Sequence, residues 1–501
     1  MMQNTEAAWK GLLNDKRRKP KKGNDQDTRE TRTEIERDYD RILFSTPVRR
    51  LADKTQVFPL DKNDSVRTRL THSHEVSNLA RSVGTALVFV KGKKGNQIAC
   101  GVKQSQRNIP ALLAAIGLAH DLGNPPFGHQ GEFAIRAWFR KNENAALPVV
   151  QAHLNTKEYK KYEQYKQDFL QFEGNAQAFR LVTRLQIISD DFGLDLTYAT
   201  LAALLKYPTK SNCVNKEKAS LKKHGFFAAE QHIVEEVRKK TGLSEGQRHA
   251  LTYIMEACDD IAYSVLDAED TIKKGLASFC DLMDHMLTNS RGNDFIKKII
   301  DISFKKYREY QKIDLSAVEL NDISMQRFRV FAIHEMILES IAAFRKHETA
   351  ILENKFNASL LSEESDAGKL CEALKNFSNT RAYQHYSVLE AELAGYNAII
   401  GLMDFFWVAI KDRERPEDPK SRRCSPFTRY VYKKISENYR RIFENPTKKD
   451  KKLPLWYREC LLLTDMISGM TDSFAIELYR DLSKIKGDFN VHNFLSTTFR
   501  K

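Results

Sequence analysis

Helical periodicity without any alternating strand pattern is the feature that most constrains how this chain can fold. Over residues 251–270, LTYIMEACDDIAYSVLDAED, Ile254, Cys258, Ile261 and Val265 recur at the spacing of one face of an α-helix. No stretch of any length alternates apolar and polar residues, and there is no internal repeat or heptad run. Glycine (22) and proline (13) are scarce among the 501 residues, which favours long helices over turn-rich β architecture. We therefore predict an all-α fold.

Composition divides the chain into three segments. Residues 1–34 are polar, with a basic cluster at 16–22, and we expect them to form a mobile arm. Helical runs are predicted over 66–90, over 110–122 with Pro110 in its first turn, and within 156–190. Charged loops are expected at 412–426 and 445–454. We predict a core over 35–290 and a helical C-terminal part over 291–501.

Charge and cysteine content limit the class of protein. The chain carries 80 Lys and Arg against 66 Asp and Glu, and this net charge of +14 favours an anionic partner such as phosphates or nucleic acid. The seven cysteines are scattered without a C-x-x-C pair, which is typical of free thiols in a reducing cytoplasm. No run of about 18 apolar residues is present, so we expect no membrane span. The basic residues near the start follow an apolar patch, the wrong order for a secretory signal.

A set of histidines and aspartates has the composition of a metal site. His120 and Asp121 end the apolar run PALLAAIGLAHDLG, where a lone histidine would be explained by helix capping. His72 lies on the preceding predicted helix, and Asp259 lies on the polar face of 251–270. Two imidazoles and two carboxylates suit Mn²⁺, Mg²⁺, Fe²⁺, Co²⁺ or Zn²⁺. On an octahedral ion they would leave about two positions for water and a phosphoryl oxygen.

These four residues resemble the H…HD…D signature of HD-domain metallohydrolases. An ordered set of segments also resembles the bacterial deoxyguanosinetriphosphate triphosphohydrolase (dGTPase) family: RRLADKTQVFPL (49–60), RTRLTH (67–72), AHDLGNPPFGHQGE (119–132), FEGNAQ (172–177), MEACDDIAY (255–263) and ISGMTD (467–472). An HD pair alone arises by chance in a chain of this size, whereas the ordered set covers nearly the whole chain. The resemblance implies an HD-domain helical core with additional C-terminal helices.

The resemblance implies hydrolysis of dGTP to deoxyguanosine and inorganic tripolyphosphate, with a metal-activated water attacking the α-phosphate. One divalent ion per subunit, Mn²⁺ or Mg²⁺ before Fe²⁺, Co²⁺ or Zn²⁺, would be held by His72, His120, Asp121 and Asp259. His129 and Glu132 match the family's proton-transfer residues, and a histidine oriented by a carboxylate suits protonation of the leaving oxygen. His74, two residues after His72, cannot share its helix face, so we expect a packing or supporting residue.

The resemblance also implies which residues bind the nucleotide. For the deoxyribose they are Gln56, Tyr263 and Asp267, with the Tyr263 ring leaving no room for a 2′-hydroxyl. For the triphosphate they are Arg69, Asn175, Lys206, Tyr207 and Lys223. For guanine they are Tyr383, an aromatic for stacking, and Glu392, a carboxylate that accepts from the guanine edge. Arg429 would reach the site of a neighbouring subunit in a homohexamer. Ordinary solvated surface chemistry is the alternative for the lysines, for the 259–267 polar face and for the base-contacting residues.

Other functions stay open at the level of sequence. A broader dNTP triphosphohydrolase, an HD phosphodiesterase and a non-catalytic single-stranded nucleic-acid-binding protein are the alternatives. Residues 157–166, KEYKKYEQYK, interleave Tyr with Lys, which suits stacking and phosphate attraction in single-stranded DNA. An amphipathic helix with inward Tyr and solvated Lys explains the same pattern and is slightly favoured. The 16–22 and 448–452 clusters are the other surplus charges.

Overall fold

The computed structural model describes residues 2–20, 29–61, 63–90, 97–148, 156–186, 190–290 and 292–486. Across these ranges the chain forms helices joined by loops, and the β features amount to three isolated bridges. The predicted all-α fold is confirmed. The division into a core and a C-terminal part stays a prediction, because helices from both sides pack on one another.

Two antiparallel helices, α4 (Arg69–Phe89) and α5 (Ser105–Ala119), form the centre of the fold. They approach closely because Gly117 faces the backbone of Ser77, where an added Cβ would lie 2.7 Å from the Ser77 Cα. The Ser77 hydroxyl donates to Ala114 O at 2.8 Å across the same contact. This approach brings the start of α4 next to the end of α5. Both α2 (Glu34–Leu43) and α12 (Ala250–Lys273) pack against this pair.

Helix boundaries differ from the sequence expectation at two places. Helix α5 begins at Ser105, so Pro110 lies inside it and not in its first turn. The 156–190 region divides into α8 (Thr156–Leu170), α9 (Gly174–Arg180) and the π-helical turn η2 (Leu181–Leu185). Shorter helices are α3 (Thr46–Arg50), α6 (Gly128–Lys141), α7 (Glu143–Ala146), α10 (Tyr198–Leu204), α11 (Gln231–Thr241) and α19 (Glu437–Glu444). The 3-10 turns are η1 (Leu51–Asp53), η3 (Ser211–Cys213), η4 (Ala219–Leu221), η5 (Ala228–Glu230) and η7 (Asp450–Lys452).

The N-terminal segment is packed on the protein, contrary to the expected mobile arm. Residues Met2–Leu12 form helix α1, and the Trp9 indole is fully buried, with its N–H donating to Glu348 at 2.8 Å. Arg17, from the basic cluster, pairs with Glu34 and Asp38. The apolar residues of this segment are few but lie on one face, and their burial outweighs the polar composition. Residues 21–28, including the end of the cluster, lie outside the described residues.

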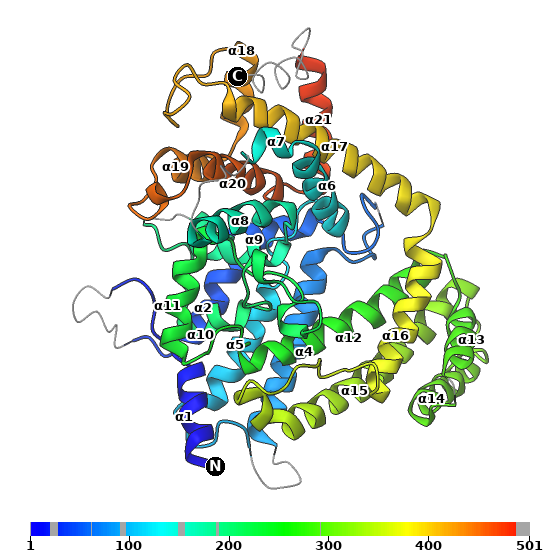
Figure 1. Cartoon of the computed structure of the whole chain (residues 1–501). Helices are drawn as coiled ribbons and strands as arrows, with labels where there is room; N and C mark the ends of the chain where they lie inside the picture. Colours follow the sequence, from blue (N-terminus) through cyan, green and yellow to red (C-terminus); the bar gives the residue numbers. More distant parts are fainter. Residues whose placement is uncertain are drawn as a thin grey trace.

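The C-terminal helices cover one side of α12 and then extend to the far end of the molecule. Helices α15 (Ala317–Leu352) and α16 (Asp366–Ser378) pack on α12, and α13 (Phe279–Asn289) and α14 (Asp294–Tyr310) lie outside them (Figure 1). After the π-helical turn η6 (Asn379–Tyr383), the long helix α17 (Tyr386–Lys411) leads towards α18 (Pro426–Lys434), α20 (Leu455–Ser468) and α21 (Asp472–Ile485), opposite α1 (Figure 1).

Among the described residues, helix α17 alone is long and apolar enough to cross a membrane by length and composition. The sequence expectation excluded such a segment, and α17 passes the test with a mean hydropathy of 1.6 over an 18-residue window. Its surroundings explain the composition, since 61% of that window is buried inside the protein. It packs against α6, α18, α20 and α21 as a core helix.

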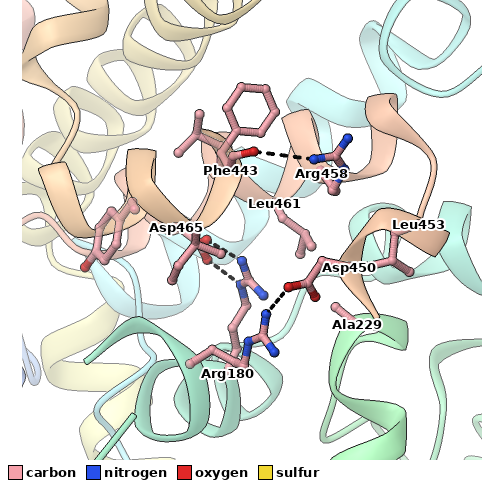
Figure 2. Close-up of a pocket in the computed structure, with 12 residues that line it drawn as sticks. Arg180, Ala229, Phe443, Asp450, Leu453, Arg458, Leu461 and Asp465 are labelled. Atoms are coloured by element: carbon pink, nitrogen blue, oxygen red, sulfur yellow. Dashed lines mark hydrogen bonds and ion pairs between the residues drawn. The ribbon is translucent and has the colours of Figure 1, made fainter. Parts of the chain in front are cut away.

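Buried ion pairs fix α9 against the C-terminal helices. Arg180, at the end of α9, donates from Nε and Nη2 to the two oxygens of Asp465 at 2.8 and 2.7 Å (Figure 2). Its third nitrogen donates to Glu230 at 2.8 Å. The cavity beside this cluster is only about 20 Å³, room for about one water. The cluster is therefore structural, and it orients the start of α9, which faces the larger cavity described next.

Candidate functional site

A cavity of about 380 Å³ opens between the starts of α4, α6 and α9, the middle of α12 and the start of α17. Its volume suits a small-molecule ligand. All but two of the residues expected to bind metal or substrate, or to transfer protons, line it. These lining residues are Gln56, Arg69, His72, His120, Asp121, His129, Glu132, Asn175, Lys206, Tyr207, Lys223, Asp259, Tyr263, Tyr383 and Glu392.

Three candidate metal ligands meet at the inner wall of this cavity. The Oδ1 atom of Asp259 lies 3.2 Å from His72 Nε2 and 3.4 Å from His120 Nε2. The two imidazole rings are 5.5 Å apart between centroids, at 63°. One ligand atom from each member of this trio lies within 4.8 Å of the other two. Helices α4 and α12 and the end of α5 each supply one member, which explains why their close packing is needed.

The imidazole nitrogens of the trio fit a metal ion. His120 Nδ1 lies 2.7 Å from Gly117 O, and in the neutral ring this hydrogen bond leaves the lone pair of Nε2 facing the cavity. His120 Nε2 and His72 Nδ1 are buried with no hydrogen-bond partner among the described residues. Buried polar nitrogens without a partner are rare in proteins, and a divalent cation would satisfy the cavity-facing one.

Asp121, the fourth expected ligand, lies beside the trio and has other partners. Its Oδ2 accepts from Arg69 Nη1 at 2.5 Å, and its Oδ1 accepts from Asn124 Nδ2 at 2.6 Å. The Oδ1 atom is 3.6 Å from His120 Nε2, and the compact trio does not include it. Each carboxylate oxygen has a second lone pair, so these contacts leave Asp121 able to bind a cation.

Two carboxylates and the cations that face them set the electrostatics of the inner wall. Burial alone would lower the pKa of His120, but Asp121 and Asp259 raise it to about 9. Burial would raise the pKa of Asp259, yet the positive charges of His120 and Lys206 hold it well below its usual range. Arg69 and the neighbouring histidines likewise keep the pKa of Asp121 low against its burial. Both carboxylates are therefore ionised at neutral pH, as a cation site requires.

His129 and Glu132 form a pair at the start of α6. His129 Nδ1 lies 3.1 Å from Glu132 Oε2, while Glu132 Oε1 accepts from Gly174 N at 2.7 Å. The His129 side chain is 80% exposed and the Glu132 side chain 2% exposed. Burial raises the pKa of Glu132, but His129 and Lys223 outweigh it and lower the pKa. A buried, ionised carboxylate thus orients an imidazole that lines the cavity.

The cations of the cavity each face a carboxylate. Lys206 Nζ donates to Asp259 Oδ2 at 3.3 Å, and Lys223 Nζ donates to Glu173 Oε2 at 2.9 Å. Burial lowers the pKa of Lys223, but Glu173 and Glu132 raise it overall. Together with Arg69 these side chains supply three positive charges that could pair with phosphate oxygens.

The opposite end of the cavity is aromatic and amide-lined. Tyr263 and Tyr383 face each other with ring centroids 6.4 Å apart, and the Tyr383 hydroxyl donates to Asp267 Oδ2. Gln56 Oε1 is buried with no hydrogen-bond partner among the described residues. Glu392, from α17, accepts from Gln130 Nε2 at 3.2 Å. Flat apolar surfaces beside unpaired polar atoms are suited to a nucleoside.

Two sequence expectations, for Asp267 and His74, differ from the structure in position, and the expectation for Arg429 stays a prediction because it concerns a neighbouring subunit. Asp267 does not line the cavity but lies behind Tyr383, and burial raises its pKa well above the usual value. Arg429 is on α18, outside the cavity, where its Nε donates to Ser425 O at 3.3 Å. His74 is exposed, so the expected packing role is wrong. In the 157–166 stretch, Tyr162 and Tyr165 pack inward against Trp456, as the amphipathic alternative predicted, whereas Tyr159 is 49% exposed, contrary to it.

Several residues in or beside the cavity were not expected from the sequence, and Thr55, Val57 and Pro59 are among those that line it. Glu173 lies inside FEGNAQ (172–177) and Gln130 inside AHDLGNPPFGHQGE (119–132), but the position of neither residue in its motif predicts a chemical role. Glu173 holds Lys223, and burial together with Glu132 raises its pKa. Asn124 and Phe127 also line the cavity, in the rigid turn after His120. Polar residues inside recognised motifs were the available signal.

Comparison with known proteins gives full-length similarity. A deoxyguanosinetriphosphate triphosphohydrolase-like protein of Listeria monocytogenes is 37% identical over 485 residues, covering 95% of this chain and 99% of the relative. Deoxyguanosinetriphosphate triphosphohydrolases of Enterobacter sp. and Yersinia enterocolitica are 31% and 33% identical, over 90% and 89% of this chain and 94% and 93% of the relatives. No protein-family model matches the chain.

Proposed function

The chain belongs to the deoxyguanosinetriphosphate triphosphohydrolase family, and we propose that it hydrolyses dGTP in one step to deoxyguanosine and inorganic tripolyphosphate. The observation that carries the proposal is the content of one cavity. It combines a histidine and aspartate group, a histidine and glutamate pair, three cations and an aromatic end. Family membership supports hydrolysis of a deoxynucleoside triphosphate in general, and attack at the α-phosphate is the finer part of the proposal.

A divalent metal ion would bind next to His120 Nε2, the buried nitrogen that faces the cavity and has no hydrogen-bond partner among the described residues. We propose His72, His120 and Asp259 as ligands, with Asp121 as the fourth, and one Mn²⁺ or Mg²⁺ per subunit. When bound, such an ion supplies Lewis acidity towards a phosphoryl oxygen and lowers the pKa of water. The protein's own part is to keep both carboxylates ionised and the imidazoles oriented, through Gly117, Asn124 and the packing of α4 on α5.

The His129–Glu132 pair is the proposed proton donor to the leaving 5′ oxygen. Glu132 is held by the backbone of Gly174, so it fixes the orientation of the His129 ring. The free ring nitrogen can then deliver a proton as the bond between the α-phosphorus and the 5′ oxygen breaks.

The three cations are proposed to bind the triphosphate. Arg69, Lys206 and Lys223 each form an ion pair with a carboxylate at the cavity wall. A triphosphate would offer several anionic oxygens and compete for these side chains. Asn175 and Tyr207 line the same wall and would complete the contacts.

The nucleoside is proposed to occupy the aromatic end. Tyr263 and Gln56 would contact the deoxyribose, and Asp267 would act through Tyr383, which it holds. Tyr383 and Glu392 would contact the guanine, and burial raises the pKa of Glu392 while Gln130 opposes this. A carboxylate there accepts from the guanine edge and repels the acceptor atoms of other bases.

The assembly and location of the enzyme remain proposals. We propose a cytoplasmic homohexamer in which Arg429 reaches a neighbouring subunit, and single-stranded DNA as a second ligand. Support for the location is that all seven cysteines are free thiols. Mass photometry of the wild type and of Arg429→Ala would test the assembly.

Product analysis tests the activity. Purified protein is incubated with Mn²⁺ and each dNTP in turn, and the products are separated by anion exchange. We expect deoxyguanosine and tripolyphosphate in equal amounts from dGTP, no dGDP, and slower turnover of the other three nucleotides. Stepwise release of orthophosphate through dGDP would refute the proposal, and equal rates on all four would replace it with a broad dNTP triphosphohydrolase.

A further inference from the structure

Segment 49–60, which carries Gln56, meets segment 467–472, to which no chemical role has been assigned, behind the cavity. Arg50 Nη1 donates to Gly469 O at 2.9 Å, and Lys54 Nζ donates to Ser468 O at 2.8 Å. The backbone N–H of Thr55 donates to Asp472 Oδ2 at 2.9 Å, and its hydroxyl donates to the same oxygen. The last residues of 467–472 thus bind the strip of chain that carries Gln56 into the cavity.

Asp472 also binds the segment that carries the proton donor. Its second oxygen, Oδ1, accepts from the backbone N–H of Phe127 at 2.8 Å. Phe127 has φ +60, a left-handed conformation that a bulky residue adopts only when its surroundings hold it there. It directly precedes α6, whose first turn contains His129 and Glu132. One carboxylate therefore joins the backbones of two cavity-lining residues, Thr55 and Phe127.

A buried lysine makes a parallel connection. Lys54 Nζ donates to Asn124 O at 2.5 Å as well as to Ser468 O. Asn124 in turn donates to Asp121. Lys54 is 3% exposed and Asp472 2% exposed, so both lie away from water and from the nucleotide. Neither lines the cavity, and any effect they have on the reaction must pass through the residues they hold.

We propose that Asp472 is a positioning residue for the hydrolytic reaction. It fixes the start of α6 relative to residues 54–56, which carry Gln56, so that His129 faces the substrate. This inference rests on the proposed function for its chemical meaning. The geometry itself, one buried carboxylate accepting from two cavity segments, stands without it.

The chain offers a matched control one residue away. The Ser473 hydroxyl donates to Asp53 Oδ1 at 2.9 Å, an exposed bond that joins the same two segments. This bond does not involve α6. Ser473→Ala therefore removes a link of similar length and sequence position without touching the backbone of Phe127.

The first test uses amide hydrogen exchange by mass spectrometry and requires neither metal nor substrate. In Asp472→Asn the amide group presents N–H donors where the carboxylate accepted, so one of the two cavity segments loses its acceptor. We expect exchange in peptides covering 54–58 and 123–134 to become at least about 10-fold faster, with Ser473→Ala unchanged. Thr55→Val, which removes only the hydroxyl, should give a smaller change over 54–58. Wild-type protection of both peptides in Asp472→Asn would overturn the inference.

The second test is kinetic and separates positioning from general stability. We expect Asp472→Asn to lower kcat on dGTP by about 10- to 100-fold, with KM changed less than about 3-fold, because misplaced reacting groups slow the chemical step. In a His129→Ala background the same substitution should cause no further loss of kcat, since the group that it positions is gone. A loss that multiplies with that of His129→Ala would overturn the positioning role. A wild type without turnover would refute the proposed function instead, and the exchange test would still decide the contact.

Discussion

Replacing Glu132 by glutamine tests the proton-donor pair most sharply. The substitution keeps the shape of the side chain and its acceptor for Gly174 N, but it removes the charge 3.1 Å from His129 Nδ1. With an amide N–H facing Nδ1, the ring takes the tautomer protonated on its other nitrogen, and the imidazolium loses its stabilising partner.

The expected magnitude follows from the distance and the exposure. Two unit charges about 4 Å apart attract by about 4 kcal/mol at an effective dielectric constant of about 20. Because the His129 side chain is 80% exposed, solvent screening reduces this value, and we take about 2 to 2.7 kcal/mol. That corresponds to a loss of about 30- to 100-fold in kcat.

The assay is steady-state release of deoxyguanosine from dGTP with saturating Mn²⁺, with thermal unfolding measured in parallel. KM should change little, since Glu132 orients the proton donor and the cations bind the phosphates. Glu235→Gln, on the exposed face of α11, is the matched control and should behave as wild type. A Glu132→Gln enzyme with kcat within about 3-fold of wild type would refute the assignment of this pair.

Three further perturbations have defined outcomes. Asp259→Asn should weaken Mn²⁺ binding, measured by isothermal titration calorimetry, by more than about 100-fold, whereas Asp260→Asn, whose carboxylate pairs with a lysine on α16, should leave it unchanged. His249 caps α12 as a neutral ring, and burial lowers its pKa to about 4. Between about pH 4 and 6.5 the folded state therefore binds fewer protons than the unfolded chain, so the free energy of unfolding should fall by up to about 3 kcal/mol as the pH drops through this window. The His249→Asn variant should show a flatter dependence of Tm on pH. Gly123→Ala places a Cβ 2.1 Å from the backbone of α9 and should cost at least about 2 kcal/mol in urea unfolding, against about 1 kcal/mol for Gly275→Ala, where only the positive φ is unfavourable. Equal Mn²⁺ affinity of Asp259→Asn and Asp260→Asn would contradict the first argument. The same dependence of Tm on pH in His249→Asn and wild type would contradict the second, and an equal loss of unfolding free energy in Gly123→Ala and Gly275→Ala would contradict the third.

Sequence reasoning reached the fold and most of the cavity for identifiable reasons. Helical periodicity in 251–270 is strong because α12 buries one face and turns the other, with Asp259 and Tyr263, into the cavity. The spacing of His72, His120 and Asp259 could be matched to a family because a metal site tolerates few arrangements. The motif set thus predicted which residues line one cavity, while their chemical roles stay predictions.

The failures share a different cause, since they depend on tertiary packing that composition does not express. The polar N-terminal segment docks because Trp9 finds a buried position against α15 and α11, which no local pattern indicates. Lys54 and Asp472 bond backbone atoms of distant segments, and such partners leave no trace in residue spacing. The apolar stretch of α17, interrupted by Asp404, passes a membrane-span test by composition, and its packing against α6, α18, α20 and α21 identifies it as a core helix.

The most direct test of the central claim is hydrolysis of dGTP in ¹⁸O-labelled water with mass analysis of both products. Attack of water at the α-phosphorus predicts one ¹⁸O atom in tripolyphosphate and none in deoxyguanosine. Label in the deoxyguanosine would place the attack on carbon, and label in orthophosphate accompanied by dGDP would place it on the terminal phosphate. Either result would contradict the account.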